Sequence, residues 1–235
     1  MMKKNEFLVT RNFLSTLVLL ASLGICLFGA IIGILGSCES LVAGALYSLI
    51  ASFMVMKVIF ANKGSKMVQQ SLKLASFVIM FAIVMGILDI TIFSIVRIYK
   101  ASKGLLMEPG IITIILAVGA LIVNIYFYYE ISKMQGEEKL LKENDGFTET
   151  TPQKPEDLNL AELKDIIMIG IIVPLLVVVG SFGAREVTLY LDAIAALCIT
   201  FLILVPRVIT LVKDQYREFT QGRALKRQVT EAEPI

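Results

Sequence analysis

Few residues in this chain have side chains that could do chemistry, and the clearest of them stands inside an apolar run. Asp89 lies in the sequence GILDITIF. An ionisable group within a membrane-spanning segment is costly and usually serves a function. We interpret Asp89 as an ion or proton site facing the interior of a helix bundle. The alternative is a buried acid that packs against a basic or hydroxyl partner.

Three neutral polar residues join Asp89 in a candidate transport pathway. Tyr47 and Ser48 lie in SCESLVAGALYSLIASF, on a face that also carries small residues. Small and hydroxyl residues on a membrane helix usually face another helix, so this segment is expected to be an inner helix. Asn124 stands deep in a further apolar run, where its amide is expected to hydrogen-bond between helices.

Charged residues near the ends of the apolar runs each allow two interpretations of their role. Glu162, Lys164 and Asp165 are either a vestibule that collects cations or the solvated start of a helix. Lys57 either extends its ammonium group to the membrane surface or pairs with an acid on a neighbouring helix.

Composition excludes several function classes. There is no histidine, and the three cysteines are scattered, so we expect neither a metal centre nor a disulfide framework. No nucleophile triad or phosphate-binding loop is visible, and we expect no enzymatic activity and no cofactor. The net charge of +2 gives no indication of nucleic-acid binding.

Six long apolar runs must position these residues. The chain is 57% hydrophobic, and each run approaches the ~20 residues that cross a bilayer as a helix. We therefore predict an all-α membrane protein with a six-helix transmembrane bundle. The predicted spans are 13–35, 40–61, 74–96, 111–131, 165–183 and 189–212. They are joined by a linker over 132–164 and flanked by an N-terminus over 1–12 and a tail over 213–235.

Two glycines in the first span have the spacing of a helix-packing motif. Gly29 and Gly33 are four residues apart, which would bring two helix backbones close together. The alternative is ordinary apolar filler.

The basic residues predict the topology. Most of the 22 lysines and arginines flank the chain termini or lie in loops on the same side as the termini. Only Arg97, Lys100, Lys103 and Arg185 fall on the other side. The positive-inside rule places both termini, the linker and the tail in the cytoplasm. We expect a multi-pass protein of the inner or plasma membrane.

This pattern resembles the transmembrane domain of the cation diffusion facilitator family. The run SCESLVAGALYSLIASF is similar to the family's span-two signature, and LDAIAALCITFLIL, with Asp192 as its acid, is similar to the opening of its sixth span. Asn124 falls where members often carry an asparagine. The resemblance covers about residues 8–220 and implies a dimeric transporter that moves a divalent cation by alternating access.

The family's metal ligands do not map onto ligands here. The span-two pair falls on Tyr47 and Ala51, and the acid before it falls on Gly44. The span-five pair falls on Lys164 and Met168, or in another register on Ala161 and Asp165. Neither register builds the four-ligand cage that zinc prefers. The residues given after the sixth span, 213–235, are too few for the family's cytoplasmic domain, so we expect this domain to be missing.

Two functions therefore remain open from sequence. One is a secondary cation transporter with a rearranged site around Asp89. The other is a transport-inactive relative that acts as a membrane scaffold or regulatory partner, in a homodimer or in a heterodimer with a related transporter.

Overall fold

The described part of the chain forms a bundle of six long helices. The computed structural model describes residues 4–61, 66–101, 111–144, 160–181, 185–213 and 216. The helices are α1 (Lys4–Leu35), α2 (Glu39–Ala61), α3 (Lys66–Ala101), α4 (Ile111–Asn144), α5 (Leu160–Ser181) and α6 (Arg185–Cys198). A π-helical turn, η1 (Ile199–Leu204), continues α6, and α-helix resumes from Val205 to Lys213. All six are long and apolar enough to cross a membrane, as the sequence predicts.

Several helices extend beyond the predicted spans. α1 begins at Lys4, α3 runs from Lys66 to Ala101, and α4 continues to Asn144, well into the predicted linker. Membrane helices end where a breaker or a loop stops them, and the polar sequence after 131 contains no proline before Pro152. Residues 145–159 of that linker lie outside the described residues, and α5 begins within it, at Leu160.

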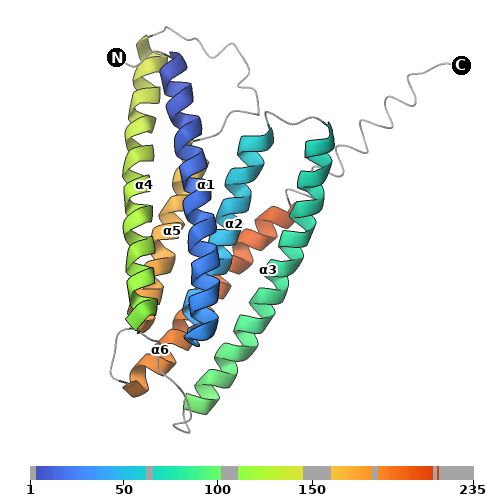
Figure 1. The fold of residues 1–235 in the computed structure, drawn as a ribbon, viewed down its shortest axis with the longest axis vertical. Coiled ribbons are helices and arrows are strands. Elements are labelled where there is room, and N and C mark those ends of the chain that lie inside the picture. The colour runs from blue at the N-terminus through green and yellow to red at the C-terminus, as the bar shows by residue number, and fades with distance from the viewer. Residues whose placement is uncertain are drawn as a thin grey trace, which may run out of the picture.

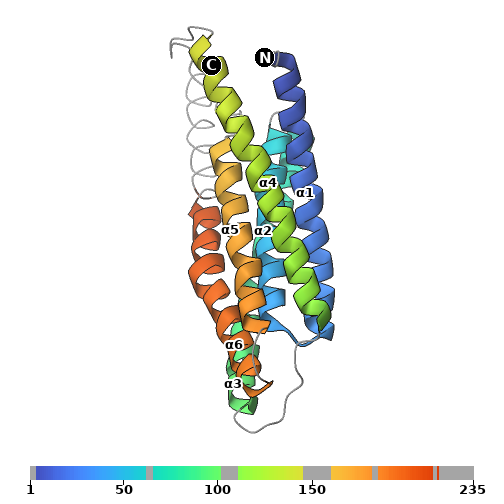
Figure 2. The same cartoon turned by 90° about the vertical axis from the view of Figure 1, so that its left-hand side faces the viewer.

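The helices run up and down between two ends of the bundle (Figures 1 and 2). One end holds the start of α1, the end of α4 and the start of α5; we call it the proximal end. The other holds the turn between α1 and α2, the end of α3 and the start of α6; we call it the distal end. Helices α1 to α5 therefore run between the two ends, and α6 with its continuation to Lys213 runs from the distal end toward the proximal end.

α2 is the central helix. Of its span, 61% is buried inside the protein, against 17% for the spans of α1 and α3. α1 packs on α2 and α4 packs on α5, while α2 also contacts α5, α3 and α6. The expectation of an inner helix here is confirmed.

α3 lies at the periphery, packed mainly against α2 and α6 (Figure 1). Its outward face carries large apolar side chains such as Phe77, Phe81, Ile92 and Phe93. Apolar side chains on the outside of a six-span bundle are what hydrocarbon accommodates, because lipid tails are as apolar as leucine.

Candidate functional site

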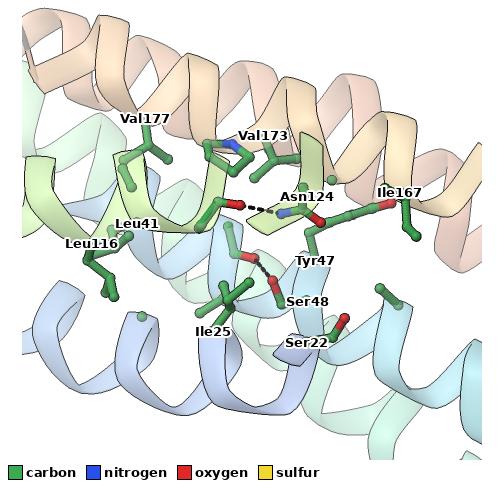
Figure 3. A pocket seen from close by; sticks show the side chains of 18 of the residues that line it. Ser22, Ile25, Leu41, Tyr47, Ser48, Leu116, Asn124, Ile167, Val173 and Val177 are labelled. Carbon is green, nitrogen blue, oxygen red and sulfur yellow. Dashed lines mark hydrogen bonds between the residues drawn. The ribbon is translucent and has the colours of Figure 1, made fainter. Parts of the chain in front are cut away.

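A small cavity lies in the middle of the bundle, between α1, α2, α4 and α5 (Figure 3). Its volume is about 30 Å³, which is room for a water molecule or one small ion. Its polar lining consists of Ser22, Tyr47, Ser48 and Asn124, and the rest is apolar. Three of these four residues belong to the predicted transport pathway.

Glycine and alanine residues keep this cavity open. A Cβ atom on Gly170 would lie 2.8 Å from Asn124 Oδ1, and one on Gly44 would lie 3.1 Å from a Val173 methyl. Ala45 and Ala51 line the same space. Larger residues at these positions would fill the cavity.

The polar side chains of the cavity use their donors on the backbone. The Tyr47 hydroxyl donates to the carbonyl oxygen of Ile166 at 2.5 Å, and Asn124 Nδ2 donates to that of Ala120 at 2.8 Å. Ser48 Oγ donates to the carbonyl of Gly44 at 3.1 Å. A hydroxyl or amide that donates keeps its oxygen lone pairs. The cavity therefore offers neutral oxygen acceptors.

The structure does not bring Asp89 to this cavity. Its side chain is exposed on the outward face of α3, so the interpretation of Asp89 as an ion site facing the bundle interior is wrong. The alternative, a buried acid with a partner, is wrong as well. Helix α3 presents Ser76, Ile83, Ile90, Ser94 and Arg97 to the protein, and Asp89 lies off that face.

The cavity face of α5 differs from both expected registers. Ile166, Ile167 and Gly170 face Tyr47 and Ala51 there, so that Tyr47 and Ala51 lie in the cavity without Lys164 or Met168. Lys164 is half-buried toward the proximal end, with Nζ 3.4 Å from Gln135 Oε1 and 5.1 Å from the centre of the Tyr128 ring.

The remaining α5 candidates point away from the cavity or cannot be placed. Met168 is 45% exposed, and Ala161 and Asp165 are exposed as well. Glu162 belongs to α5, but its side chain lies outside the described residues. A vestibule formed by Glu162, Lys164 and Asp165 therefore stays a prediction.

Carboxylates are missing from the lining of the cavity. Across the described ranges, no three histidine, cysteine, aspartate or glutamate side chains gather where they could hold a metal ion. The side chains at the cavity thus do not supply the anionic ligands that a tightly held divalent ion needs.

A second polar site lies at the distal end, and sequence reasoning missed it. Asp192 of α6 is fully buried and reaches the first turn of α2. Its carboxylate accepts hydrogen bonds from the backbone N–H groups of Glu39 at 3.1 Å and Ser40 at 3.2 Å. The first N–H groups of a helix lack partners within the helix, so Asp192 acts as an N-cap supplied by a distant part of the chain.

Side chains from α2, α3 and the turn before α2 complete this distal cluster. The Ser40 hydroxyl and the Cys38 thiol also donate to Asp192, the thiol at 3.1 Å. Arg97 of α3 is 3% exposed and lies 3.0 Å from Asp192 Oδ2, and it also donates to Glu39 and to the carbonyl oxygen of Ser37. Burial and then the neighbouring Asp192 carboxylate raise the pKa of the Cys38 thiol to about 12.

The sequence held a partial signal for this cluster. In the sequence, Asp192 is the acid that opens the predicted sixth span, and Arg97 is one of few basic residues predicted on the side opposite the termini. Nothing in their spacing indicates that residues 39, 97 and 192 meet.

Comparison with known proteins identifies no relative: no family model, no curated protein and no solved structure matches this chain.

Proposed function

We propose that this chain is a membrane transporter that moves a small cation by alternating access through the cavity between α1, α2, α4 and α5. One observation carries the proposal. Tyr47 and Ala51, the positions to which the family resemblance assigns the span-two ligands, both line a cavity at the centre of a six-span bundle. Transporter substrate sites typically lie near the bilayer midplane between helices.

The chemistry of the cavity selects among ions. Its acceptors are neutral oxygens of Tyr47, Ser48 and Asn124. The cost of removing water from an ion rises steeply with its charge, and burial of an uncompensated charge is expensive. Neutral oxygens can replace the hydration shell of a monovalent cation, as carbonyl groups do in potassium channels. We therefore favour a monovalent cation over zinc.

The packing around the cavity suits alternating access. Toward the proximal end, a buried apolar cluster from α1, α2, α4 and α5 separates the cavity from the surface. Its core includes Val18, Val55, Ile131 and Leu163, each at most 2% exposed. At the distal end the polar cluster around Asp192 ties α2 to α3 and α6. The proximal packing is apolar and the distal contacts are polar, so the two ends of the bundle are held by different interactions.

A second function is favoured by the lack of carboxylates at the cavity. A bundle without an anionic ligand set is also what a transport-inactive scaffold or regulatory partner would have. Under this reading the chain acts through a homodimer or a heterodimer with a related transporter, and the cavity is a packing defect.

Ion flux into proteoliposomes separates the two functions. Wild-type protein should carry a saturable flux of potassium or sodium, and the Gly170→Val substitution should abolish it because the added side chain meets Asn124. Gly119→Val on α4 is the matched control, since a Cβ there meets nothing within 4 Å. Absence of flux for potassium, sodium and zinc in wild type would reject transport and leave the scaffold function.

A further inference from the structure

The distal cluster carries more acid than base, and this excess is the starting point for a second site. Glu39 and Asp192 contribute two carboxylates, and Arg97 contributes one guanidinium. With both acids ionised, the cluster holds one excess negative charge in a region where Asp192 and Arg97 are almost inaccessible to solvent. Buried charge without a counter-charge is expensive, and uptake of one proton removes the excess.

The two carboxylates are not equivalent. Asp192 is fully buried, accepts from two backbone N–H groups, the Ser40 hydroxyl and the Cys38 thiol, and forms an ion pair with Arg97. Hydrogen bonds that donate to a carboxylate favour its ionised form. Among the described residues, Glu39 accepts a hydrogen bond from Arg97, through the same nitrogen that lies 3.0 Å from Asp192 Oδ2, and its side chain is 17% exposed. Glu39 is thus both less satisfied and reachable from the distal surface.

A buried hydroxyl beside the cluster is also unsatisfied. Ser94 lies one turn before Arg97 on the buried face of α3 and is fully buried, and its Oγ has no hydrogen-bond partner among the described residues. Buried polar atoms normally find a partner, so this one marks unused hydrogen-bonding capacity next to Arg97.

We propose that Glu39 is a proton-binding site at the distal end, and that protonation of Glu39 removes its ionic contact with Arg97. A hydronium ion from the distal side gives its proton to a Glu39 carboxylate oxygen and leaves as water. The charge of the cluster changes from −1 to 0. Neutral Glu39 no longer pairs with Arg97 as an anion, while Asp192 and the Ser37 carbonyl keep Arg97 in place.

The charged groups around Glu39 come from every element packed against it. They are Arg97 on α3, Asp192 on α6 and the Cys38 thiol in the turn before α2. Lys100, one turn further along α3, is exposed. The side chains of Arg185 and Glu186 at the start of α6 lie outside the described residues. This inference does not depend on transport, because proton binding can be measured without ion flux.

Infrared difference spectroscopy of the full chain in lipid nanodiscs tests the proposal. Lowering the pH from about 8 to about 5.5 leaves ordinary carboxyl groups largely ionised, since they titrate near 4. We expect a protonated-carboxyl C=O band to appear in wild type, to be lost in Glu39→Gln and to remain in the control Glu130→Gln. A band that persists in Glu39→Gln, or no band in wild type, would overturn the proposal.

A second variant, Asp192→Asn, tests which of the two carboxylates takes up the proton. Asp192→Asn keeps the shape of the side chain but removes the excess charge, so the Glu39 band should move to lower pH. If Asp192→Asn instead eliminates the band while Glu39→Gln retains it, the proton resides on Asp192 and the assignment to Glu39 is rejected. With the protein inserted in one orientation in liposome membranes, acidifying the inside or the outside alone shows which side of the membrane supplies the proton. The proposal requires the distal side.

Discussion

Asp192 shows how much a single buried carboxylate can organise. It caps the start of α2, binds Arg97 of α3 and itself belongs to α6, so one side chain holds three helices. Removing one partner of a buried ion pair leaves the other charged and unpaired, which costs about 3–5 kcal/mol.

We therefore expect Asp192→Ala to destabilise the protein by roughly that amount, and Asp192→Asn by less because the amide oxygen still accepts from the α2 backbone. Unfolding by denaturing detergent, followed by circular dichroism, measures both. The control is Asp165→Ala, since Asp165 is exposed at the proximal end. Equal stability of Asp192→Ala and wild type would show that the cluster is not a structural tie.

The reactivity of the Cys38 thiol toward a maleimide reports whether the distal cluster is buried. The thiolate is the reactive form, and with a pKa of about 12 the Cys38 thiol stays protonated up to pH 9 and beyond. Labelling by a maleimide should be slow in the folded protein at pH 7–9, where an ordinary thiol with a pKa near 8.5 reacts readily. Mass spectrometry of labelled peptides before and after denaturation measures the difference. Fast labelling of Cys38 in the folded protein would contradict the burial.

At the level of single residues, sequence reasoning found the neutral groups and misjudged the charged ones. Tyr47 and Ser48 line the cavity because residues on the inner helix α2 face its neighbours, and Asn124 of α4 lies at the same cavity. Asp89 was expected inside because a charge in hydrocarbon is costly, yet its position on α3 turns it outward. The cost of placing a charge in hydrocarbon makes an acid in a span a candidate for function. The direction of its side chain depends on the rotation of the helix about its axis, which the sequence of α3 does not determine.

Among the elements, the crossing of α1 and α2 depends on the two glycines expected to form a packing motif, and the expectation is confirmed. A Cβ on Gly33 would lie 2.7 Å from a Val42 methyl and 3.1 Å from the Val42 backbone nitrogen, and one on Gly29 would lie 3.2 Å from Ala45 Cβ. Such close approach is what small residues permit between membrane helices.

We expect Gly33→Ala to push α1 from α2 and to cost about 1–3 kcal/mol, the usual range for overpacking. Gly24→Ala on the same helix is the matched control, because a Cβ there meets nothing within 4 Å. That change should be neutral or stabilising by up to about 1 kcal/mol through helix propensity. Parallel unfolding curves of the two variants provide the test. If the two alanines have the same effect, the glycines do not set the crossing.

Helix α3 carries its acid outward, midway along the span Leu74–Lys100. An aspartate at the centre of a membrane helix costs about 3 kcal/mol on insertion scales. Asp89→Leu should therefore favour membrane insertion of α3 by roughly that amount. Both Asp89→Leu and Asp89→Asn should leave cation flux unchanged. A glycosylation-based insertion assay of α3 and the flux assay measure these effects. Loss of flux in Asp89→Asn would return Asp89 to the transport pathway.

The helices were predictable, and their rotations were not. Long apolar runs determine that α1 to α6 form, since only hydrogen-bonded helices satisfy the backbone in lipid. Helix α5 is apolar all around between Ile166 and Val179, so its sequence has no polar stripe to mark the face toward α2. For this reason Lys164 and Met168 were the wrong positions to expect at the cavity, which is lined by Ile166, Ile167 and Gly170.

For the whole molecule, the sequence gives no account of which helices surround the cavity. α1, α2, α4 and α5 enclose it, while α6, which contacts α2, α3 and α5, and α3 contribute no residue to its lining. That division arises from contacts between residues far apart in the chain, such as Arg97 with Asp192 and Tyr47 with Ile166.

The basic residues predict the orientation of the whole molecule in the membrane. Arg97 is buried in the distal cluster, which leaves Lys100, Lys103 and Arg185 as the basic residues of the distal side. Because cytoplasmic loops are enriched in lysine and arginine, the proximal end should face the cytoplasm. Single cysteines introduced at Lys103 and at Thr148, with the native cysteines replaced by alanine, report the two sides. A membrane-impermeant maleimide added to intact cells should label Lys103→Cys and reach Thr148→Cys only after permeabilisation. The reverse pattern would invert the topology, and labelling of both in intact cells would contradict an even number of spans in a single orientation.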